Sequence, residues 1–263
     1  MIRTIAILSV LAWLPVAAFL PLPVMAAPCP GNPATLGTER VLEVSAAMTP
    51  RVGRKHFPAT LPLGPQELVL TFDDGPWPET TPAVLAALAR ECVRASFFVL
   101  GQHAEAYPEL TRRILAEGHT VGHHTYSHKL LNRVSVAMAE AEINHGIEVN
   151  EYAVYGRRRI DPVTPFFRFP GFASTPDLLD RLARRGIVVF GADLWASDWN
   201  PMSPAQQFSL VMARVEQADR GILLFHDTKA QTAKMLPGFL RELKRRGYKI
   251  VHVVPAGTRG ILR

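Results

Sequence analysis

Short apolar segments alternate with helix-like segments through most of this sequence, and this alternation limits the folds that the chain can adopt. Seven segments have the length and apolar character of buried strands: 68–72, 95–100, 119–122, 166–169, 187–192, 221–225 and 248–254. Several are apolar at every position, which is typical of parallel strands covered on both faces. Between them the pattern predicts helices over 81–90, 108–117, 135–149, 175–185, 203–218 and 230–246. The sequence therefore predicts an α/β fold, either a barrel or a doubly wound sheet.

Titratable side chains follow five of the predicted strands, close to their carboxyl ends. In chain order they are Asp73 and Asp74, then His123, His124 and His128, then Arg168, then Asp193 and Asp198, and finally His226 and Asp227. Barrels and doubly wound sheets both bind ligands at the carboxyl ends of their strands. Because chance would distribute polar groups over both ends, we interpret this edge as an active site.

The stretch "LVLTFDDGPWP" places two adjacent carboxylates, Asp73 and Asp74, at the end of a buried strand. Burial of an ionised carboxylate costs free energy, and two neighbouring carboxylates repel each other. A bound metal ion would account for the pair, since its charge neutralises one carboxylate and keeps the other ionised.

His124 and His128 stand four residues apart in "HTYSH". On an extended strand their side chains would be roughly 13 Å apart, whereas a helical or tightly bent turn brings them within about 5–6 Å, close enough to share a metal ion. Two surface histidines on a helix are the alternative. With one aspartate of the pair they would form a ligand set that suits a hydrolytic zinc site and also a non-haem iron oxygenase. The second aspartate favours hydrolysis, because a water molecule activated by a metal needs a neighbouring base.

Three further groups near this edge have both a functional and a structural interpretation. Arg168 could orient the free aspartate or lie at the surface near a strand end. His226 could be a general acid for the leaving group or a hydrogen-bonded core residue. Trp195 and Trp199 could stack on sugar rings or belong to the core. The histidines without an identifiable partner are His56, His103, His119, His145 and His252, and an additional role beside the ligand pair stays open for His123.

Residues 1–26 have the pattern of an export signal, with Arg3 before a long apolar run and small residues in "VMAAP". A membrane anchor is the alternative, but prolines within the run and the small-residue site favour cleavage after Ala26 or Ala27. We therefore expect an exported protein with no stable membrane span after cleavage, periplasmic or, as the alternative, extracellular.

Two segments follow this signal. Residues 27–66 are rich in Pro, Gly and Thr and predict an irregular N-terminal arm, whereas residues 67–263 predict the catalytic domain. In an oxidising compartment Cys29 and Cys92 could form a disulfide, but Cys92 could equally be a small buried side chain.

The formal net charge of +6 falls to +5 when Arg3 leaves with the signal (6 − 1). This modest positive charge is compatible with anionic cell-envelope material. The basic runs "RVGRK" and "YGRRRI" lack interleaved aromatic residues and nucleic-acid-binding motifs, so we predict solvated surfaces and no nucleic-acid partner. We expect a monomer.

Five motifs occur in order along the chain: "TFDDGP", "HTYSH", "RFPGF", "DLWASDW" and "LFHD". Together they resemble carbohydrate esterase family 4, the polysaccharide deacetylases, over about residues 68–254. The resemblance implies a distorted (β/α)7-type barrel. It also implies a metal-dependent hydrolase that removes N-acetyl groups from an N-acetylglucosamine-type polysaccharide or oligosaccharide and releases acetate. The metal would be Zn²⁺, with Co²⁺ or Ni²⁺ as alternatives, and the partner an N-acetylated glycan.

The resemblance also implies roles for individual residues. The metal ligands would be Asp74, His124 and His128. The catalytic residues would be Asp73 as the base, Arg168 as its partner, His226 as the general acid and Asp198 as the residue that tunes this acid. The substrate-binding residues would be Gly171, whose N–H would stabilise the oxyanion, with Phe172, Trp199 and Leu224.

Two positions depart from the family pattern. Relatives commonly have an aromatic residue where this chain has Gly171; glycine still supplies the N–H, and Phe172 could replace the lost ring. His123 stands where the family has an asparagine, which bears on metal choice. The sequence does not distinguish peptidoglycan, chitin fragments and other N-acetylhexosamine polymers as substrates.

Two other interpretations fit part of the pattern. A carbohydrate-binding protein on a degenerate enzyme fold should lack the base, a metal ligand or the acid, and this chain has all of them. A related barrel enzyme could act on small non-peptide amides. The export signal, and the tryptophans Trp195 and Trp199 near the predicted active-site edge, favour a polymeric substrate instead.

Overall fold

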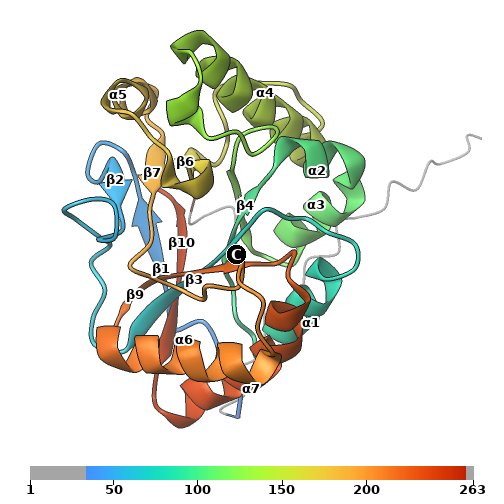
Figure 1. The fold of residues 1–263 in the computed structure, drawn as a ribbon, viewed down its shortest axis with the longest axis vertical. Helices are drawn as coiled ribbons and strands as arrows, with labels where there is room; N and C mark the ends of the chain where they lie inside the picture. Colours follow the sequence, from blue (N-terminus) through green and yellow to red (C-terminus); the bar gives the residue numbers. More distant parts are fainter. Residues whose placement is uncertain (1–33, 259–263) are drawn as a thin grey trace, which may run out of the picture.

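The computed structural model describes residues 34–258, which form one sheet of ten strands with helices around it (Figure 1). The strands are β1 (Arg40–Val44), β2 (Arg51–Val52), β3 (Glu67–Asp73), β4 (Ser96–Val99), β5 (Thr120–His123), β6 (Phe166–Phe167), β7 (Val188–Phe190), β8 (Leu194–Trp195), β9 (Gly221–His226) and β10 (Lys249–Pro255). The helices are α1 (Thr81–Arg90), α2 (Gly101–Ala106), α3 (Pro108–Ala116), α4 (Val136–Tyr155), α5 (Pro176–Arg184), α6 (Pro204–Ala218) and α7 (Ala230–Arg245), with short 3₁₀ turns η1 (Leu131–Arg133) and η2 (Pro170–Phe172).

β3 lies at the centre of the sheet, and every one of its residues is buried. It pairs in parallel with β9 over Leu68–Asp73 and with β4 over Thr71–Asp73. From β4 the parallel pairing continues through β5, β6 and β7 to β2, and from β9 it continues to β8. Within residues 34–258 no pairing joins β2 to β8, so hydrogen bonds do not close the sheet into a complete ring. The predicted α/β fold with a parallel sheet is confirmed.

Alternate residues of the strands pack into two different cores. Leu68, Leu70 and Phe72 of β3 belong to a cluster that includes side chains of α1, α6 and α7. Val69, between them, belongs to a second cluster with Phe98, inside the curve of the sheet. Both faces are covered, which explains why the strand is apolar at successive positions.

β1 pairs in parallel with β10, from Arg40 opposite Val251 to Val44 opposite Pro255. β10 in turn pairs with the first two residues of β3. This pairing joins segments from near the two ends of the described chain.

All seven predicted strands are present, and the six predicted helices correspond to α1 and α3–α7. The structure adds α2 and the short strands β1, β2 and β8, which the sequence analysis did not predict. Since β1 and β2 lie within the expected irregular arm, that segment is only partly irregular. α4 is longer than predicted: it ends at Tyr155, and Gly156, with a φ of 69°, caps it in the left-handed conformation.

Three helices begin at hydroxyl side chains that satisfy free backbone N–H groups. Ser135 caps α4, Thr175 caps α5 and Ser203 caps α6. At α6 the side chain of Gln206 reciprocates, which completes a capping box. These contacts explain why the predicted starts of the three helices are accurate.

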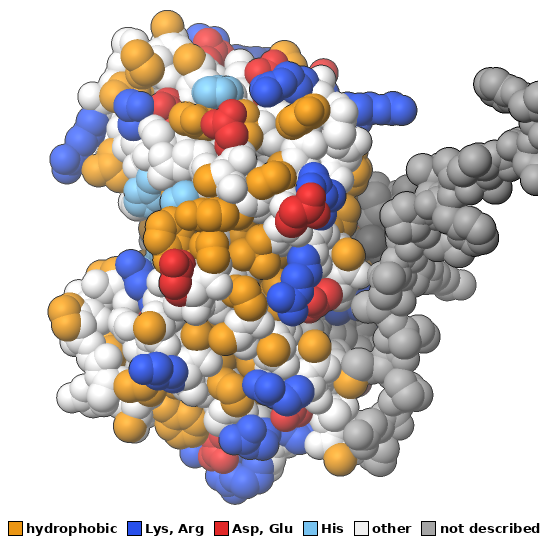
Figure 2. Space-filling model, turned by 90° about the vertical axis from the view of Figure 1, so that its right-hand side faces the viewer, with side chains coloured by type: hydrophobic (Ala, Val, Ile, Leu, Met, Phe, Trp, Pro, Cys, Tyr) orange, Lys and Arg blue, Asp and Glu red, His pale blue; other side chains and the backbone are white. Residues whose placement is uncertain are grey.

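No helix within residues 34–258 combines the length and the apolar character needed to cross a membrane. The predicted export signal and Cys29 lie outside the described residues, and Cys92 is disulfide-bonded. On the face shown in Figure 2, lysine and arginine side chains are interspersed with acidic side chains.

Candidate metal and catalytic site

The alternation of β3 and β9 directs two predicted site residues to the inner face of the sheet. Asp73 lies four residues after Val69 on β3, and His226 lies four residues after Ile222 on β9, so each pair of side chains is on the same face of the sheet. Val69 and Ile222 both belong to the second cluster, inside the curve of the sheet. Asp73 and His226 are also paired in register. The two side chains therefore emerge together at the carboxyl ends of adjacent strands.

The alternation of β5 directs two neighbouring histidines to opposite faces of the sheet. His124 follows the strand toward the inside, whereas His123 faces α4, where its Nδ1 lies 3.2 Å from Asn150 Nδ2 and its Nε2 lies 3.9 Å from Glu151 Oε1. Burial lowers the pKa of His123 to about 3, so its ring is neutral. The additional role left open for His123 beside the ligand pair has no support in this geometry.

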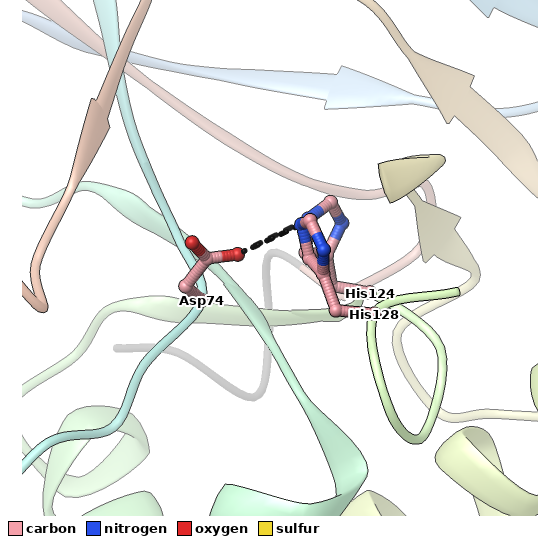
Figure 3. A group of neighbouring side chains, drawn as sticks. All are labelled: Asp74, His124 and His128. Carbon is pink, nitrogen blue, oxygen red and sulfur yellow. Dashed lines mark ion pairs between the residues drawn. The ribbon is translucent and has the colours of Figure 1, made fainter. Parts of the chain in front are cut away.

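Asp74, His124 and His128 converge, with one possible ligand atom from each within 4.8 Å of the others. Asp74 Oδ1 lies 3.5 Å from His124 Nε2 and 3.3 Å from His128 Nε2 (Figure 3). This oxygen is buried and has no hydrogen-bond partner among the described residues. A cation between the three side chains would satisfy it, and a set of two imidazole nitrogens and one carboxylate oxygen fits Zn²⁺.

A sharp bend, not a helix, brings the two histidines together. Thr125 and His128 have φ values of 67° and 64°, and the His128 N–H donates to Thr125 Oγ1 at 3.1 Å. The imidazole centroids are 5.2 Å apart. A positive φ is unusual for a β-branched residue such as Thr125 and costs on the order of 1–3 kcal/mol. This is the tightly bent turn that the four-residue spacing requires.

Hydrogen bonds to the backbone orient the ligand set. His124 Nδ1 donates to the carbonyl oxygen of Arg168 at 2.7 Å, which leaves the lone pair of Nε2 facing Asp74. His103, for which the sequence indicated no partner, places its Nδ1 2.6 Å from the carbonyl oxygen of Asp74. No local pattern predicts this contact, because it joins α2 to the end of β3.

The charge of Asp74 is maintained by its surroundings. Burial alone would raise its pKa, but the imidazoles of His124, His226 and His128 hold it well below its usual range. Asp74 is therefore ionised at neutral pH, as a metal ligand must be.

Gly146, in the middle of α4, allows this helix to pack directly on the bend after His124. A Cβ at Gly146 would lie 2.4 Å from the carbonyl carbon of Thr125 and 2.7 Å from the backbone nitrogen of Tyr126. Real Cβ atoms essentially never come that close, and backbone atoms cannot move aside as a flexible side chain can.

We expect Gly146→Ala to lower the free energy of unfolding by about 1–3 kcal/mol, because the clash outweighs the helix propensity of alanine, worth about 1 kcal/mol. The matched variant is Gly238→Ala on α7, where a Cβ would meet no atom within 4 Å. It should instead raise stability by about 0.5–1 kcal/mol. Denaturant unfolding of both variants measures the difference, and equal effects would contradict the close packing.

Asp73 forms a buried ion pair with Arg168, whose Nη1 lies 2.7 Å from Asp73 Oδ1. The guanidinium is fully buried and also donates to Thr71 Oγ1 and to the carbonyl oxygen of Gly191. The alternative of a surface arginine is therefore wrong. The second oxygen of Asp73, Oδ2, lies 3.9 Å from His124 Nε2, so it faces the metal ligand set.

His226 forms a second pair, with Asp198. His226 Nδ1 lies 2.7 Å from Asp198 Oδ1, and the other oxygen of Asp198 accepts hydrogen bonds from the His226 backbone N–H and from Thr232 Oγ1. Burial lowers the pKa of His226, but Asp198, Asp74 and Asp73 together raise it to about 9. His226 Nε2 also faces the metal ligand set, 3.9 Å from Asp74 Oδ2.

The predicted substrate-binding residues lie on β9 and in the segments that follow β6 and β8. Gly171 is exposed within the turn η2, with a φ of 54°, and Phe172 follows it. The ring of Trp199, 47% exposed, stands edge-on to His226 with centroids 5.8 Å apart. Leu224 is buried two residues before His226, on the same face of β9.

Two acidic residues of the predicted edge have structural contacts instead. Asp193 accepts hydrogen bonds from Thr60 Oγ1 and the N–H of Ile222. Asp227 turns away from His226, accepts a hydrogen bond from Thr81 Oγ1 at 2.5 Å, and has its pKa raised to about 7 by burial.

Comparison with known proteins shows a family and several relatives to which this chain is similar. Residues 61–190 match the family model described as "Polysaccharide deacetylase". A chitooligosaccharide deacetylase of Bradyrhizobium sp. (strain ANU 289) is 32% identical over 211 residues, which cover 73% of this chain and 90% of the relative.

Two further proteins extend the comparison. The peptidoglycan-N-acetylmuramic acid deacetylase PdaC of Bacillus subtilis (strain 168) is 32% identical over 186 residues, 71% of this chain but only 38% of the relative's length. Among solved structures, the Bdellovibrio bacteriovorus peptidoglycan deacetylase Bd3279 is similar with a TM-score of 0.74 and 31% identity, covering 86% of this chain and 61% of that chain.

Proposed function

This chain belongs to the polysaccharide deacetylase family, and on that premise we propose that it is a metal-dependent hydrolase that releases acetate from an N-acetylated glycan. The observation that carries the proposal is that two charged pairs face one ligand set. Asp73, paired with Arg168, lies 3.9 Å from His124, and His226, paired with Asp198, lies 3.9 Å from Asp74. Relatives named as chitooligosaccharide, chitin and peptidoglycan deacetylases support a glycan substrate.

The metal would be held by Asp74, His124 and His128, and Zn²⁺ is our proposal for its identity. When bound, such an ion polarises a carbonyl group and lowers the pKa of a coordinated water molecule. Three protein ligands leave positions open for both.

Asp73 is proposed as the general base. Its Oδ2 faces the ligand set, while its Oδ1 is held by Arg168, so the carboxylate has a fixed orientation from which to accept a proton from the attacking water.

The backbone N–H of Gly171 is proposed to stabilise the oxyanion that forms when water attacks the acetamide carbonyl. Leu224 and Trp199 would bound the space for the acetyl methyl group, since both lie beside His226 at the mouth.

His226 is proposed as the general acid that protonates the departing sugar amine. Its Nδ1–H donates to Asp198, so the proton to be transferred is on Nε2, the nitrogen that faces the ligand set. Cleavage of the C–N bond then releases acetate and the free amine.

The proposal is tested by acetate release from N-acetylglucosamine oligomers and from purified peptidoglycan, measured in parallel. The protein is stripped of metal with a chelator, assayed, and assayed again after addition of Zn²⁺. Zinc-dependent acetate from either substrate supports the proposal, and the better substrate indicates the glycan class. Absence of acetate from both, with zinc bound, would overturn it.

Replacement of Asp198 by Asn should move the alkaline limb of the pH–rate profile to lower pH. A general acid works only while protonated, so activity falls as the pH rises through its pKa. Asp198 raises that pKa, and loss of its charge should shift the limb down by about 1–2 units. The profile of kcat/KM against pH measures this shift, with metal content as the control. An alkaline limb at the same pH in the variant and in wild type would exclude His226 as the general acid.

The remaining assignments are proposals of the same kind. We propose export directed by residues 1–26, a periplasmic location, and a monomeric catalytic unit over residues 67–263. Residues 27–66 would form an arm, of which the part from residue 34 contributes β1 and β2 to the sheet.

A further inference from the structure

The loop after β2, residues 53–57, reaches the mouth of the site although it belongs to the N-terminal arm. β2 pairs in parallel with β7, so its carboxyl end lies at the same edge of the sheet as those of β3, β5 and β9. The Lys55 N–H donates to the carbonyl oxygen of Ala192 at 3.0 Å, which fixes the loop there. Gly53 permits this approach: its φ is 109°, and a Cβ would lie 2.5 Å from the backbone nitrogen of Ala192.

A continuous row of rings connects this loop to the proposed acid. His56 stacks on Phe172 with centroids 3.6 Å apart and lies 6.1 Å from Trp195. Trp195 lies 5.9 Å from Trp199, and Trp199 lies 5.8 Å from His226. Rows of aromatic side chains provide large, rigid contact surfaces for ligands, and this one begins beside the proposed oxyanion donor and ends at His226.

Lys55 supplies a positive charge above this row. Its Nζ lies 5.1 Å from the centroid of Trp195, its side chain is exposed, and no ion pair within residues 34–258 involves it. The stacked neighbour adds no charge, because burial and the nearby Arg168 and Lys55 lower the pKa of His56 to about 4. The ammonium group therefore has free N–H donors beside a surface suited to sugar rings.

We propose that Lys55 is a specificity-determining residue that binds a carboxylate on a sugar neighbouring the one that is deacetylated, and so favours anionic N-acetylhexosamine glycans over neutral ones. This inference rests on the proposed function. The row of rings would align the glycan. The carboxylate would form an exposed ion pair with Lys55, which contributes to substrate binding and not to the chemical step. Its source is either an acid group on the sugar itself or one on an attached peptide.

The test compares wild type with Lys55→Gln and with Lys55→Arg, which retains the charge. Three substrates of equal length are used: oligomers with a free lactyl carboxylate on every second sugar, the same oligomers with that carboxylate reduced to an alcohol, and the same oligomers carrying short peptides. Binding is measured by calorimetry and acetate release by kinetics. Lys244→Gln, another exposed lysine in the last turn of α7, is the matched control for the change in net charge.

We expect Lys55→Gln to raise Kd and KM for the free-carboxylate oligomer by about 3- to 5-fold at low salt, with kcat unchanged. The reduced oligomer should show no effect, and Lys55→Arg should restore most of the loss. A larger effect with peptide-bearing oligomers than with free-carboxylate oligomers would assign the bound carboxylate to the peptide. An equal effect on all substrates, or no effect on any, would overturn the inference. Because binding is measured separately, Lys55-dependent binding without acetate release would overturn only the proposed function.

Discussion

Asp73→Asn is expected to reduce kcat by about 10²- to 10⁴-fold, the usual contribution of a general base, while the protein still binds one metal ion. An amide cannot accept the proton of the attacking water. The metal ligands are unaffected, because Asp74, His124 and His128 remain in place. Metal analysis and acetate release on the same preparation measure the two properties together.

The same substitution should also reduce stability. Arg168 is fully buried, and loss of its anionic partner typically costs about 3–5 kcal/mol. The assay is therefore made well below the melting temperature of the variant, and retention of stoichiometric metal shows that the site is folded. Asp177→Asn, which removes an exposed carboxylate on α5, is the control. Activity within tenfold of wild type in metal-loaded Asp73→Asn protein would refute the base assignment.

His128→Ala is expected to weaken metal binding by at least about 100-fold and to abolish activity at metal concentrations that saturate wild type. It removes one of the three ligands. Because the side chain of His128 is 40% exposed, the stability of the metal-free protein should change by less than about 1 kcal/mol. Calorimetric titration with Zn²⁺ measures the affinity, and denaturant unfolding of the metal-free proteins measures the stability.

The matched control for this variant is His145→Ala, which removes the same atoms from an exposed position on α4. His145 stacks on Tyr126, next to the bend that carries the ligands, but belongs to no ligand set in residues 34–258. The His145→Ala variant should bind Zn²⁺ with the same affinity as wild type. Similar affinities for the two variants would mean that His128 is not a ligand.

The strands that carry the site could be predicted because both of their faces are covered. Such strands are continuously apolar, so β3 and β9 are recognisable without knowledge of their partners, and their period of two determines which side chains face inward. This period of two also predicts that Asp73 and His226 face inward. β1, β2 and β8 were not predicted, because charged residues interrupt their sequences or lie directly beside them, and these strands depend on the neighbours with which they pair.

Parts of the site depend on contacts between distant segments. The spacing of His124 and His128 predicts a bend, but the close packing of α4 at Gly146 that accompanies it is visible only in the structure. His103 and His56 contact the site from α2 and from the N-terminal arm, and neither belongs to a recognisable motif. Their roles arise from tertiary structure alone.

The pairing of β1 with β10 also affects the order in which the protein can fold. β1 is synthesised before the other described strands, but its partner β10 is the last of them, and β10 also covers the start of β3. Until β10 is available, both β1 and the start of β3 have unpaired backbone edges, which are templates for association with other chains. The sheet therefore cannot be completed before β10 has been synthesised, and these edges need protection until then.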